Sequence, residues 1–300
     1  MPALEQLIAN NYNVAGALTR PDEPAGRKQA LTPPPVKVFA RQHNIPVLQP
    51  ERLEQAQLIS QIPRSDLFVV SAYGKVIPPE ILALPKYGAI NIHPSLLPRW
   101  RGPSPIQAAI LAGDKEAGVS LIRIDEFLDH GPIIAQKKIP LPEHIIYPQL
   151  HDTLAKIGAA LLIESLPRYL TGQIVPIAQN DAAASFSPLL KKDSGRIDWS
   201  RPGVEIERMV RAFTPWPGTW TLWPSARQIY RILVQDVEVL PDEPPHGSPG
   251  FVWQDDQNPV LVKTGKGSLA IRKLVIAGKK TTDAPSLIRG YPDVLGATFI

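Results

Sequence analysis

The sequence contains no cysteine and only two methionines among its 300 residues. The absence of cysteine excludes disulfide bonds, a thiol nucleophile and zinc sites built on cysteine. No run of about 18 apolar residues is present, so we expect no transmembrane helix. The first residues, MPALEQLIANN, lack the basic region and the apolar block of a secretory signal. We therefore expect a cytoplasmic protein with no membrane partner.

The composition is that of an ordinary globular protein, with 44% hydrophobic and 20% charged residues. Its length exceeds what a single hydrophobic core usually holds, which favours two domains. The net charge of +4 is mildly basic. Such a charge permits an anionic partner without requiring one.

Strand-like and helix-like segments alternate through the first half of the sequence. The expected strands are residues 14–19, 46–48, 67–72, 89–93, 119–124 and 133–139. The expected helices are residues 4–9, 35–41, 53–62, 79–84, 105–112 and about 148–170. Alternation at this spacing predicts an α/β domain with a mostly parallel sheet, which we place at residues 1–177.

The pattern changes in the second half. Residues 178–197 are small and polar without sustained periodicity, which indicates a linker. A helical stretch at 205–213 is then followed by short strands, expected at 219–223, 228–240, 250–253, 260–263 and 269–276. Short strands separated by Gly/Pro turns favour a small barrel at residues 198–300. We expect Trp216, Trp220 and Trp223 to lie in its core.

Two polar side chains stand in the apolar stretch INIHPSLLPRWRG. Asn91 and His93 are two residues apart, so on a strand they share one face. They also stand at the carboxyl end of the strand, where ligands bind in open α/β sheets. A lone histidine at such a place is more often structural than catalytic.

A second polar cluster, in GVSLIRIDEFLDHGPI, shifts that balance. If its strand lies near the first, Asp129 approaches His93. A carboxylate raises the basicity of an imidazole, and an asparagine amide donates a hydrogen bond to a developing oxyanion. The three residues therefore suit nucleophilic attack on a carbonyl without a metal. Asp125 is the rival carboxylate, and we interpret it as a strand-end acid.

The residues from AYGKVIPPEIL through INIHPSLLPRWRG to LDHGPI resemble the core of the folate-dependent formyltransferases in order and spacing. TRPDEPAGR near one end, and RIDWS, RAFTPWPGTW and AGKK near the other, resemble the branch that acts on methionyl-tRNA. The resemblance implies a Rossmann-like catalytic domain followed by an OB-like barrel that binds tRNA. It also implies 10-formyltetrahydrofolate as co-substrate and the amino group of initiator methionyl-tRNA as acceptor.

The resemblance also implies a role for each site residue. Asn91 is expected to hold and polarise the formyl oxygen, and His93 is expected to stabilise the oxyanion as an imidazolium. Asp129 is expected to orient His93 and to help remove the amine proton. We interpret His130 as a neighbour of the site. The expected folate pocket is lined by Ser95, Leu96, Leu97, Pro98, Tyr73, Gly74 and Ile77.

Basic residues in two regions are candidates for tRNA contact. One set is Arg20, Arg27 and Lys28, in a loop too long for a tight connection. Residues 257–282 hold six basic side chains and no acid, and from these we single out Lys263, Lys266, Lys279 and Lys280. The alternatives are a solvated loop and a polar face. We expect the protein to be a monomer.

One departure from the family pattern concerns the first strand. Family members begin with a further strand and a glycine-containing loop, whereas this sequence starts within the helix that follows them. We expect neighbouring ladder groups to be left unpaired there. The functional alternatives are a formyltransferase for a small amine, such as a nucleotide sugar or glycinamide ribonucleotide, or a non-catalytic folate- or RNA-binding relative.

Overall fold

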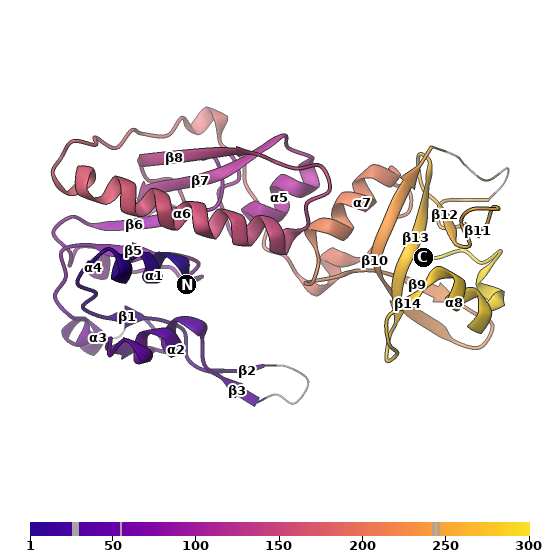
Figure 1. Cartoon of the computed structure of the whole chain (residues 1–300), viewed down its shortest axis with the longest axis horizontal. Helices are drawn as coiled ribbons and strands as arrows, with labels where there is room; N and C mark the ends of the chain where they lie inside the picture. The colour runs from indigo at the N-terminus through magenta and orange to yellow at the C-terminus, as the bar shows by residue number, and fades with distance from the viewer. Residues whose placement is uncertain (26–29, 55, 242–243, 245–246) are drawn as a thin grey trace. The chain divides into compact units, whose positions relative to one another are not determined.

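The computed structural model describes residues 1–25, 30–54, 56–241, 244 and 247–300. The chain forms two compact units (Figure 1). The first comprises Met1–Pro105, Glu116–Pro140 and His151–Ser187, and the second comprises Ile106–Lys115, Leu141–Leu150 and Pro188–Ile300. Within the described residues, no helix combines the length and the apolar composition that crossing a membrane requires.

The first unit is built from short helices and two groups of strands. Its helices are α1 (Pro2–Ala9), α2 (Pro35–Gln42), α3 (Ala56–Gln61), α4 (Pro79–Leu82) and most of α6 (Tyr147–Leu170). Its strands are β1 (Ala17–Leu18), β2 (Glu23–Ala25), β3 (Ala30–Thr32), β4 (Val47–Leu48), β5 (Phe68–Val70), β6 (Ala89–His93), β7 (Glu116–Arg123) and β8 (Ile133–Pro140). The expected α/β class is confirmed, while the β2–β3 hairpin was not expected.

The main sheet of this unit has the order β5-β6-β7-β8. Strands β5 and β6 are parallel, but β6 pairs with β7 and β7 pairs with β8 in antiparallel fashion. The sheet is therefore mixed, with less parallel pairing than expected. Residues 124–132 join β7 to β8, and this connection is too short for the crossover that parallel neighbours need.

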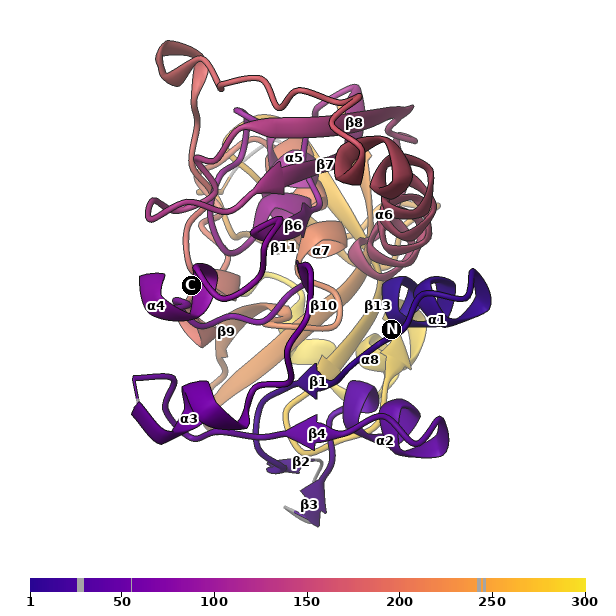
Figure 2. The ribbon, with the colours of Figure 1, turned by 90° about the vertical axis from the view of Figure 1, so that its left-hand side faces the viewer.

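The pair β1–β4 forms a separate parallel sheet (Figure 2). In the described part of the chain, β1 and β5 are not hydrogen-bonded to each other, and each has one partner strand. Within the described residues, β1 and β5 are thus edge strands of two separate sheets, and the expectation of unpaired ladder groups stays a prediction.

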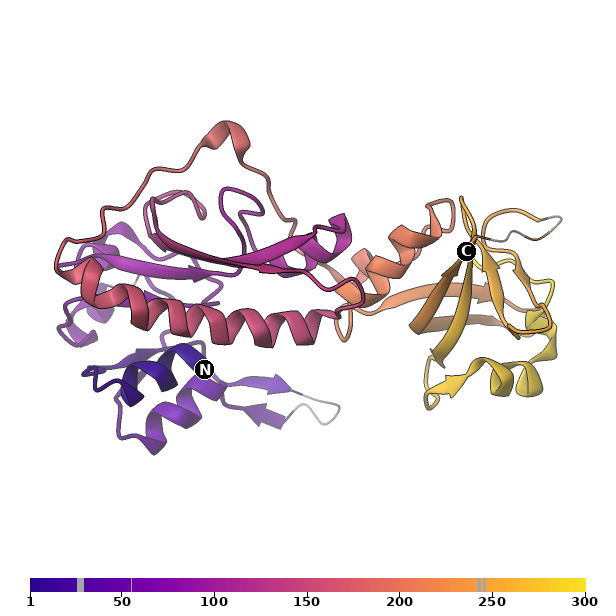
Figure 3. The same cartoon turned by 45° about the horizontal axis from the view of Figure 1, so that its top comes forward.

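Helix α6 lies along the strands of the main sheet (Figure 3). Leu154, Leu162 and Leu166 follow at multiples of four residues and are fully buried, which marks one apolar face. Gly158 completes this face. A Cβ on Gly158 would lie 2.6 Å from Cγ2 of Ile92 in β6, so the helix backbone rests directly on that strand. Because successive strand residues alternate between faces, Asn91 and His93 point away from α6.

The second unit contains α5 (Pro105–Ala112), α7 (Gly203–Ala212) and α8 (Ala284–Gly290). Its strands are β9 (Thr219–Pro224), β10 (Ile229–Leu240), β11 (Val252–Trp253), β12 (Leu261–Lys263), β13 (Ser268–Ile276) and β14 (Thr282–Asp283). Their order is β11-β12-β13-β10-β9, with β14 beside β13. Trp220 and Trp223 lie in the core as expected, but Trp216 is 51% exposed, so its expected core position is wrong. Helix α8 was not expected.

Residues 296–300 join the two edges of this sheet. On the β11 side, the N–H of Phe299 donates to the carbonyl of Gly250 at 2.9 Å. On the β9 side, Ile300 and Leu222 exchange two backbone hydrogen bonds of 2.8 and 3.0 Å. This segment therefore hydrogen-bonds near both edges of the sheet, an arrangement that fits a small barrel.

Candidate active site

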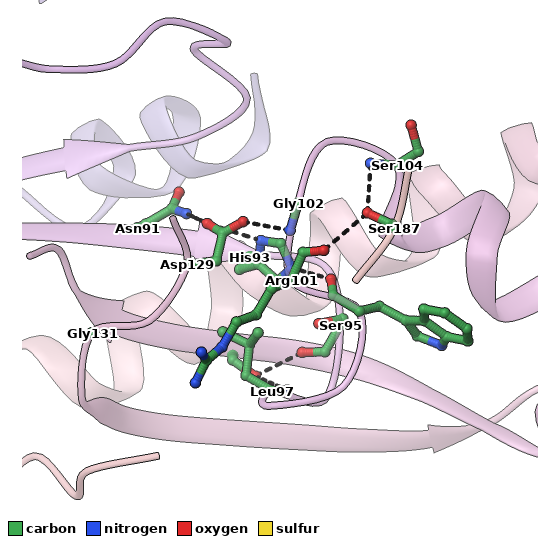
Figure 4. Close-up of polar contacts among 12 residues, drawn as sticks. Asn91, His93, Ser95, Leu97, Arg101, Gly102, Ser104, Asp129, Gly131 and Ser187 are labelled. Atoms are coloured by element: carbon green, nitrogen blue, oxygen red, sulfur yellow. Dashed lines mark hydrogen bonds and ion pairs between the residues drawn. The ribbon is translucent and has the colours of Figure 1, made fainter. Parts of the chain in front are cut away.

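Strand β6 ends in the site. Asn91 and His93 project from this strand (Figure 4), and the imidazole of His93 is only 5% exposed. The strand is held on both sides, because β5 pairs with it in parallel and β7 pairs with it in antiparallel fashion. Pairing with strands on both sides therefore fixes the backbone from which these two side chains project.

Asp129 comes from the loop between β7 and β8 and meets both residues. Its Oδ1 accepts a hydrogen bond from Nδ2 of Asn91 at 3.2 Å and lies 3.5 Å from Nδ1 of His93. Its Oδ2 accepts the backbone N–H of Gly102 at 2.8 Å. The structure thus brings together the three residues for which the sequence indicates catalytic roles (Figure 4).

The hydrogen bonds of His93 fix its tautomer. Nε2 lies 3.0 Å from the backbone carbonyl of Trp100. Since a carbonyl oxygen can only accept, Nε2 carries a hydrogen and Nδ1 faces Asp129. Burial lowers the pKa of His93 below its ordinary value, while the charge of Asp129 and the Trp100 carbonyl act against this lowering. At neutral pH the resting imidazole is therefore uncharged, and an imidazolium formed during a reaction would find an acceptor at each nitrogen.

Asp125 and His130 form a separate pair beside the site. Nδ1 of His130 lies 2.7 Å from Oδ2 of Asp125, and Nε2 lies 3.4 Å from Oδ2 of Asp181. The hydrogen bond to Asp125 raises the pKa of His130 above its ordinary value, and the charges of both carboxylates act in the same direction. Asp125 is thus engaged with His130, in keeping with its interpretation as a strand-end acid.

The turn after β6 is braced by a segment from the expected linker. The N–H of Arg101 donates to the carbonyl of Ser185 at 2.9 Å, and the N–H of Ser187 donates to the carbonyl of Arg101 at 2.7 Å. The N–H of Trp100 donates to Oγ of Ser185 at 3.0 Å. We did not expect this contact from the sequence. The two serines of SFS, at positions 185 and 187, were the signal that could have indicated it. The domain limits proposed from the sequence stay a prediction.

The turn Ser95–Pro98, expected to line a folate pocket, is tied to the sheet. Oγ of Ser120 donates to the carbonyl of Ser95 at 2.6 Å and accepts the N–H of Leu97 at 3.1 Å. Nε2 of Gln136 donates to the carbonyl of Leu97 at 2.9 Å. The side chain of Leu96 packs against Gly118 in β7. These groups form a rigid wall, and several of their polar atoms are already bonded within the protein.

Of the other expected lining residues, Tyr73 and Gly74 lie beside Arg20. Tyr73 and Ile77 pack partly buried against the cluster formed by Leu53, Leu58 and Ile81. The Tyr73 hydroxyl is buried and has no hydrogen-bond partner within the described residues. Burial raises the pKa of this hydroxyl, so it keeps its hydrogen as a donor.

Arg20 is exposed, but it is anchored at the same corner. Its Nε donates to the carbonyl of Tyr73 at 3.3 Å, and its guanidinium fills the place that a side chain on Gly74 would take. Arg27 and Lys28, the other expected tRNA contacts of this loop, lie outside the described residues.

In the second unit, the four lysines singled out from residues 257–282 lie towards the two ends of β13, whereas Arg272 and Lys273 lie within the strand. Lys263 and Lys266 flank the turn before this strand, and Lys279 and Lys280 follow it. Strand β13 has 9 residues, so the two groups lie roughly 25–30 Å apart. The four lysines therefore form two separate pairs, one towards each end of the strand.

Comparison with known families assigns the class of this protein. Residues 2–166 match the formyl transferase family, and residues 189–292 match the formyl transferase C-terminal domain. The chain belongs to the formyl transferase family.

Curated relatives narrow the comparison. Methionyl-tRNA formyltransferase of Chloroflexus aurantiacus is 41% identical over 290 residues, covering 96% of this chain and 92% of that protein. Methionyl-tRNA formyltransferase of Trichlorobacter lovleyi is 40% identical over 298 residues, covering 98% and 92%. The resemblance noted in the sequence is confirmed over nearly the whole chain.

Solved structures share the fold at low sequence identity. An N-formyltransferase of Helicobacter canadensis, in complex with folinic acid and dTDP-3-aminofucose, has a TM-score of 0.63 at 17% identity, covering 90% of this chain and 94% of that one. HypX from Aquifex aeolicus, in complex with tetrahydrofolic acid, has a TM-score of 0.62 at 18% identity. The match covers 94% of this chain and 48% of HypX, so the chain spans about half the length of that protein.

Proposed function

We propose that this protein transfers the formyl group of 10-formyltetrahydrofolate to the amino group of methionine on initiator methionyl-tRNA. The observation that supports this proposal most strongly is that the side chains of Asn91, His93 and Asp129 lie together at the end of β6. The identity of about 40% to methionyl-tRNA formyltransferases over 96–98% of the chain supports this acceptor among those that the family uses.

The bound folate would supply an activated formyl group, and the protein residues would manage charge and protons around it. Nδ2 of Asn91 carries two hydrogens; Asp129 accepts one, and we assign the other to the formyl oxygen. His93 is neutral at rest, so it can accept the proton that the attacking amine releases. The imidazolium then stabilises the negative charge on the oxygen, with Asp129 opposite its Nδ1.

The order in which His93 is first neutral and then protonated changes the role expected for this residue. The lowered pKa makes the imidazolium a product of the reaction step rather than the resting form. Asp129 orients the ring and stabilises the new positive charge, and it can also receive the amine proton through water. The transferred proton finally leaves with the folate nitrogen from which the formyl group departed, so that no net proton stays on the protein.

The folate pocket is proposed at Ser95–Pro98 and at Tyr73, Gly74 and Ile77. Among the described residues the buried Tyr73 hydroxyl has no hydrogen-bond partner, and a ligand with polar edges that reached it would satisfy it. The turn Ser95–Pro98 contributes mainly shape, since the carbonyls of Ser95 and Leu97 accept internal hydrogen bonds.

The proposed tRNA contacts are Arg20, Arg27 and Lys28 in the first unit and Lys263, Lys266, Lys279 and Lys280 in the second. The separation along β13 fits contacts with phosphates spaced along a nucleic acid better than with one phosphate. We further propose a cytoplasmic monomer, in keeping with a soluble substrate pair.

A formylation assay tests the proposal. The purified protein is incubated with 10-formyltetrahydrofolate and initiator methionyl-tRNA, and in parallel with a dTDP-amino sugar as a small-amine acceptor. Formyl-methionyl-tRNA should form, and the His93→Ala variant should lose at least about 100-fold in kcat, as expected for a general base. Product only with the amino sugar would overturn the acceptor. Unchanged turnover of His93→Ala would overturn the mechanism.

A further inference from the structure

The backbone of Asp129, which carries the proposed catalytic carboxylate, has an unfavourable conformation that neighbouring contacts must stabilise. Asp129 has a φ of +48°, in the left-handed region that side-chain-bearing residues rarely adopt. Such a conformation costs about 1–3 kcal/mol and persists only where surrounding contacts impose it. The hydrogen bonds to its side chain, from Asn91 and Gly102, do not hold the backbone itself.

The support comes from Gln179, a residue in the segment expected to be a linker. Its Nε2 donates to the backbone carbonyl of Asp129 at 2.8 Å and to the backbone carbonyl of Gly131 at 2.8 Å. An amide nitrogen carries two hydrogens, so this nitrogen is fully used by the two carbonyls. One side chain thus spans the loop on both sides of His130.

Gln179 is itself held from the other side by Arg101. The Oε1 atom of Gln179 accepts hydrogen bonds from Nε of Arg101 at 3.1 Å and from its Nη2 at 2.9 Å. A guanidinium can only donate, so it determines which end of the amide faces the loop. Arg101 is 5% exposed, and its Nη2 also pairs with Oδ1 of Asp181 at 2.7 Å.

These contacts enclose the catalytic carboxylate from two directions. Arg101 positions Gln179, which holds the Asp129 backbone, and the next residue, Gly102, donates its N–H to the Asp129 side chain. Both connections start from the same turn after β6. A displacement of Gln179 would therefore release the loop at one end while the carboxylate remained tethered at the other.

We propose that Gln179, oriented by Arg101, is a positioning residue that sets the Asp129 carboxylate against His93. It acts through the backbone of residues 129–131 and touches no substrate. The inference rests on the proposed role of Asp129 in formyl transfer. A misplacement of about 1 Å in a reacting group can reduce a rate 100-fold, so the loss of this support should be seen in kcat.

Two substitutions separate the contacts of Gln179. Gln179→Glu keeps an oxygen for Arg101 but replaces the nitrogen that donates to the two carbonyls. Gln179→Leu removes both interactions at similar size. The matched control is Gln173→Glu, at an exposed glutamine on the same unit. Steady-state kinetics with 10-formyltetrahydrofolate and initiator methionyl-tRNA give kcat and the KM for each substrate, and thermal unfolding gives Tm.

Both Gln179 variants should lose roughly 10- to 100-fold in kcat, with each KM within about threefold of the wild type. The control should keep the wild-type kcat. A purely structural role would instead lower Tm and the active fraction without this split between kcat and KM. If Gln179→Leu fails to fold, Gln179→Glu carries the test. A kcat within twofold of wild type in folded Gln179→Glu would overturn the proposal.

The pH dependence of kcat gives a second, independent signature. The charge of Asp129 raises the pKa of His93 against the lowering by burial. If Asp129 moves away, the pKa of His93 falls further and the acid limb of the kcat profile moves to lower pH. The same direction is expected for Asp129→Asn. An unshifted acid limb in Gln179→Glu, beside a shifted one in Asp129→Asn, would overturn the role of Gln179.

The Asp129→Asn variant also distinguishes a failure of the proposed function from a failure of the positioning role of Gln179. If it retains wild-type turnover, the proposed function of the site fails. If it loses turnover while both Gln179 variants keep theirs, only the positioning role fails.

Discussion

Gly102 donates its backbone N–H to Oδ2 of Asp129 at 2.8 Å, across 27 positions of sequence. This hydrogen bond joins the turn after β6 to the loop after β7. Among the described residues, the other polar contacts of this carboxylate come from Asn91 and His93 on β6. The backbone conformation of Gly102 therefore helps to set the position of the Asp129 carboxylate.

The first prediction concerns Gly102→Ala. Its φ of +109° disfavours a side chain, and the added Cβ would lie 2.7 Å from the carbonyl oxygen of Ser187. Gly172→Ala is the control, because Gly172 has a φ of +74° but no heavy atom within 4 Å of the added Cβ. Both variants should lose about 1–2 kcal/mol of stability from the backbone. Only Gly102→Ala should also lose kcat, by about 10-fold or more. Equal kcat in the two variants would contradict this role.

The second prediction concerns pH and His130. The pKa of His130 is raised in the folded protein, chiefly by its hydrogen bond to Asp125. Its contribution to stability is therefore fully present below the unfolded pKa of about 6.5 and is lost as pH rises through the raised folded pKa. The difference in Tm between the wild type and His130→Ala should be largest near pH 6 or below and should shrink at alkaline pH.

The control for this measurement is His144→Ala, at an exposed histidine. The same measurement on this variant shows how much of the pH dependence arises from removing any exposed histidine. A Tm difference for His130→Ala that grows towards alkaline pH would show that the imidazolium does not stabilise the fold.

The third prediction concerns the closure of the second unit. A Cβ on Gly250 would lie 2.2 Å from the carbonyl oxygen of Phe299, in the segment that joins the sheet edges. Gly250→Ala should therefore destabilise this unit by more than the 1–2 kcal/mol that a left-handed backbone alone costs. Gly278→Ala is the control, since Gly278 has a φ of +82° and open space around the added Cβ. Chemical unfolding followed by tryptophan fluorescence checks the difference, and equal losses would contradict it.

The fourth prediction concerns the two basic ends of β13. Lys266→Ala and Lys280→Ala should each weaken tRNA binding and reduce the salt dependence of log K by about 0.7–1. Because the two side chains lie at opposite ends of the strand, their effects should add. Binding titrations at several salt concentrations provide the measurement. A salt dependence unchanged by both substitutions would remove β13 from the tRNA contact surface.

Much of the fold could be predicted from local patterns. Strand β6 and helix α5 begin and end at the expected residues, because each apolar stretch is bounded by a clear turn. Strand β1 was expected over 14–19 but forms a ladder only at Ala17–Leu18. A strand with one partner makes few hydrogen bonds, and the sequence shows the apolar pattern but not the number of neighbours.

The candidate site likewise contains residues that the sequence could predict and one that it could not. Asn91, His93 and Asp129 could be named because their chemistry is visible in the side chains and their order matches a known pattern. Gln179 could not be found, because its partners at 129 and 131 are backbone carbonyls, 50 and 48 positions away. Any residue offers a backbone carbonyl, so the sequence carries no sign that these two need a donor.

The closing segment of the second unit also sets an order of events during synthesis. Residues 299 and 300 must reach Gly250 and Leu222, which are made about 50 and 80 residues earlier. A ribosome adds about 5–20 residues per second, so both edges of the sheet wait several seconds with unpaired backbone groups. Until residues 296–300 have been made, β9 and β11 are open edges with which other chains can pair, so an incompletely made second unit is exposed to edge-to-edge association.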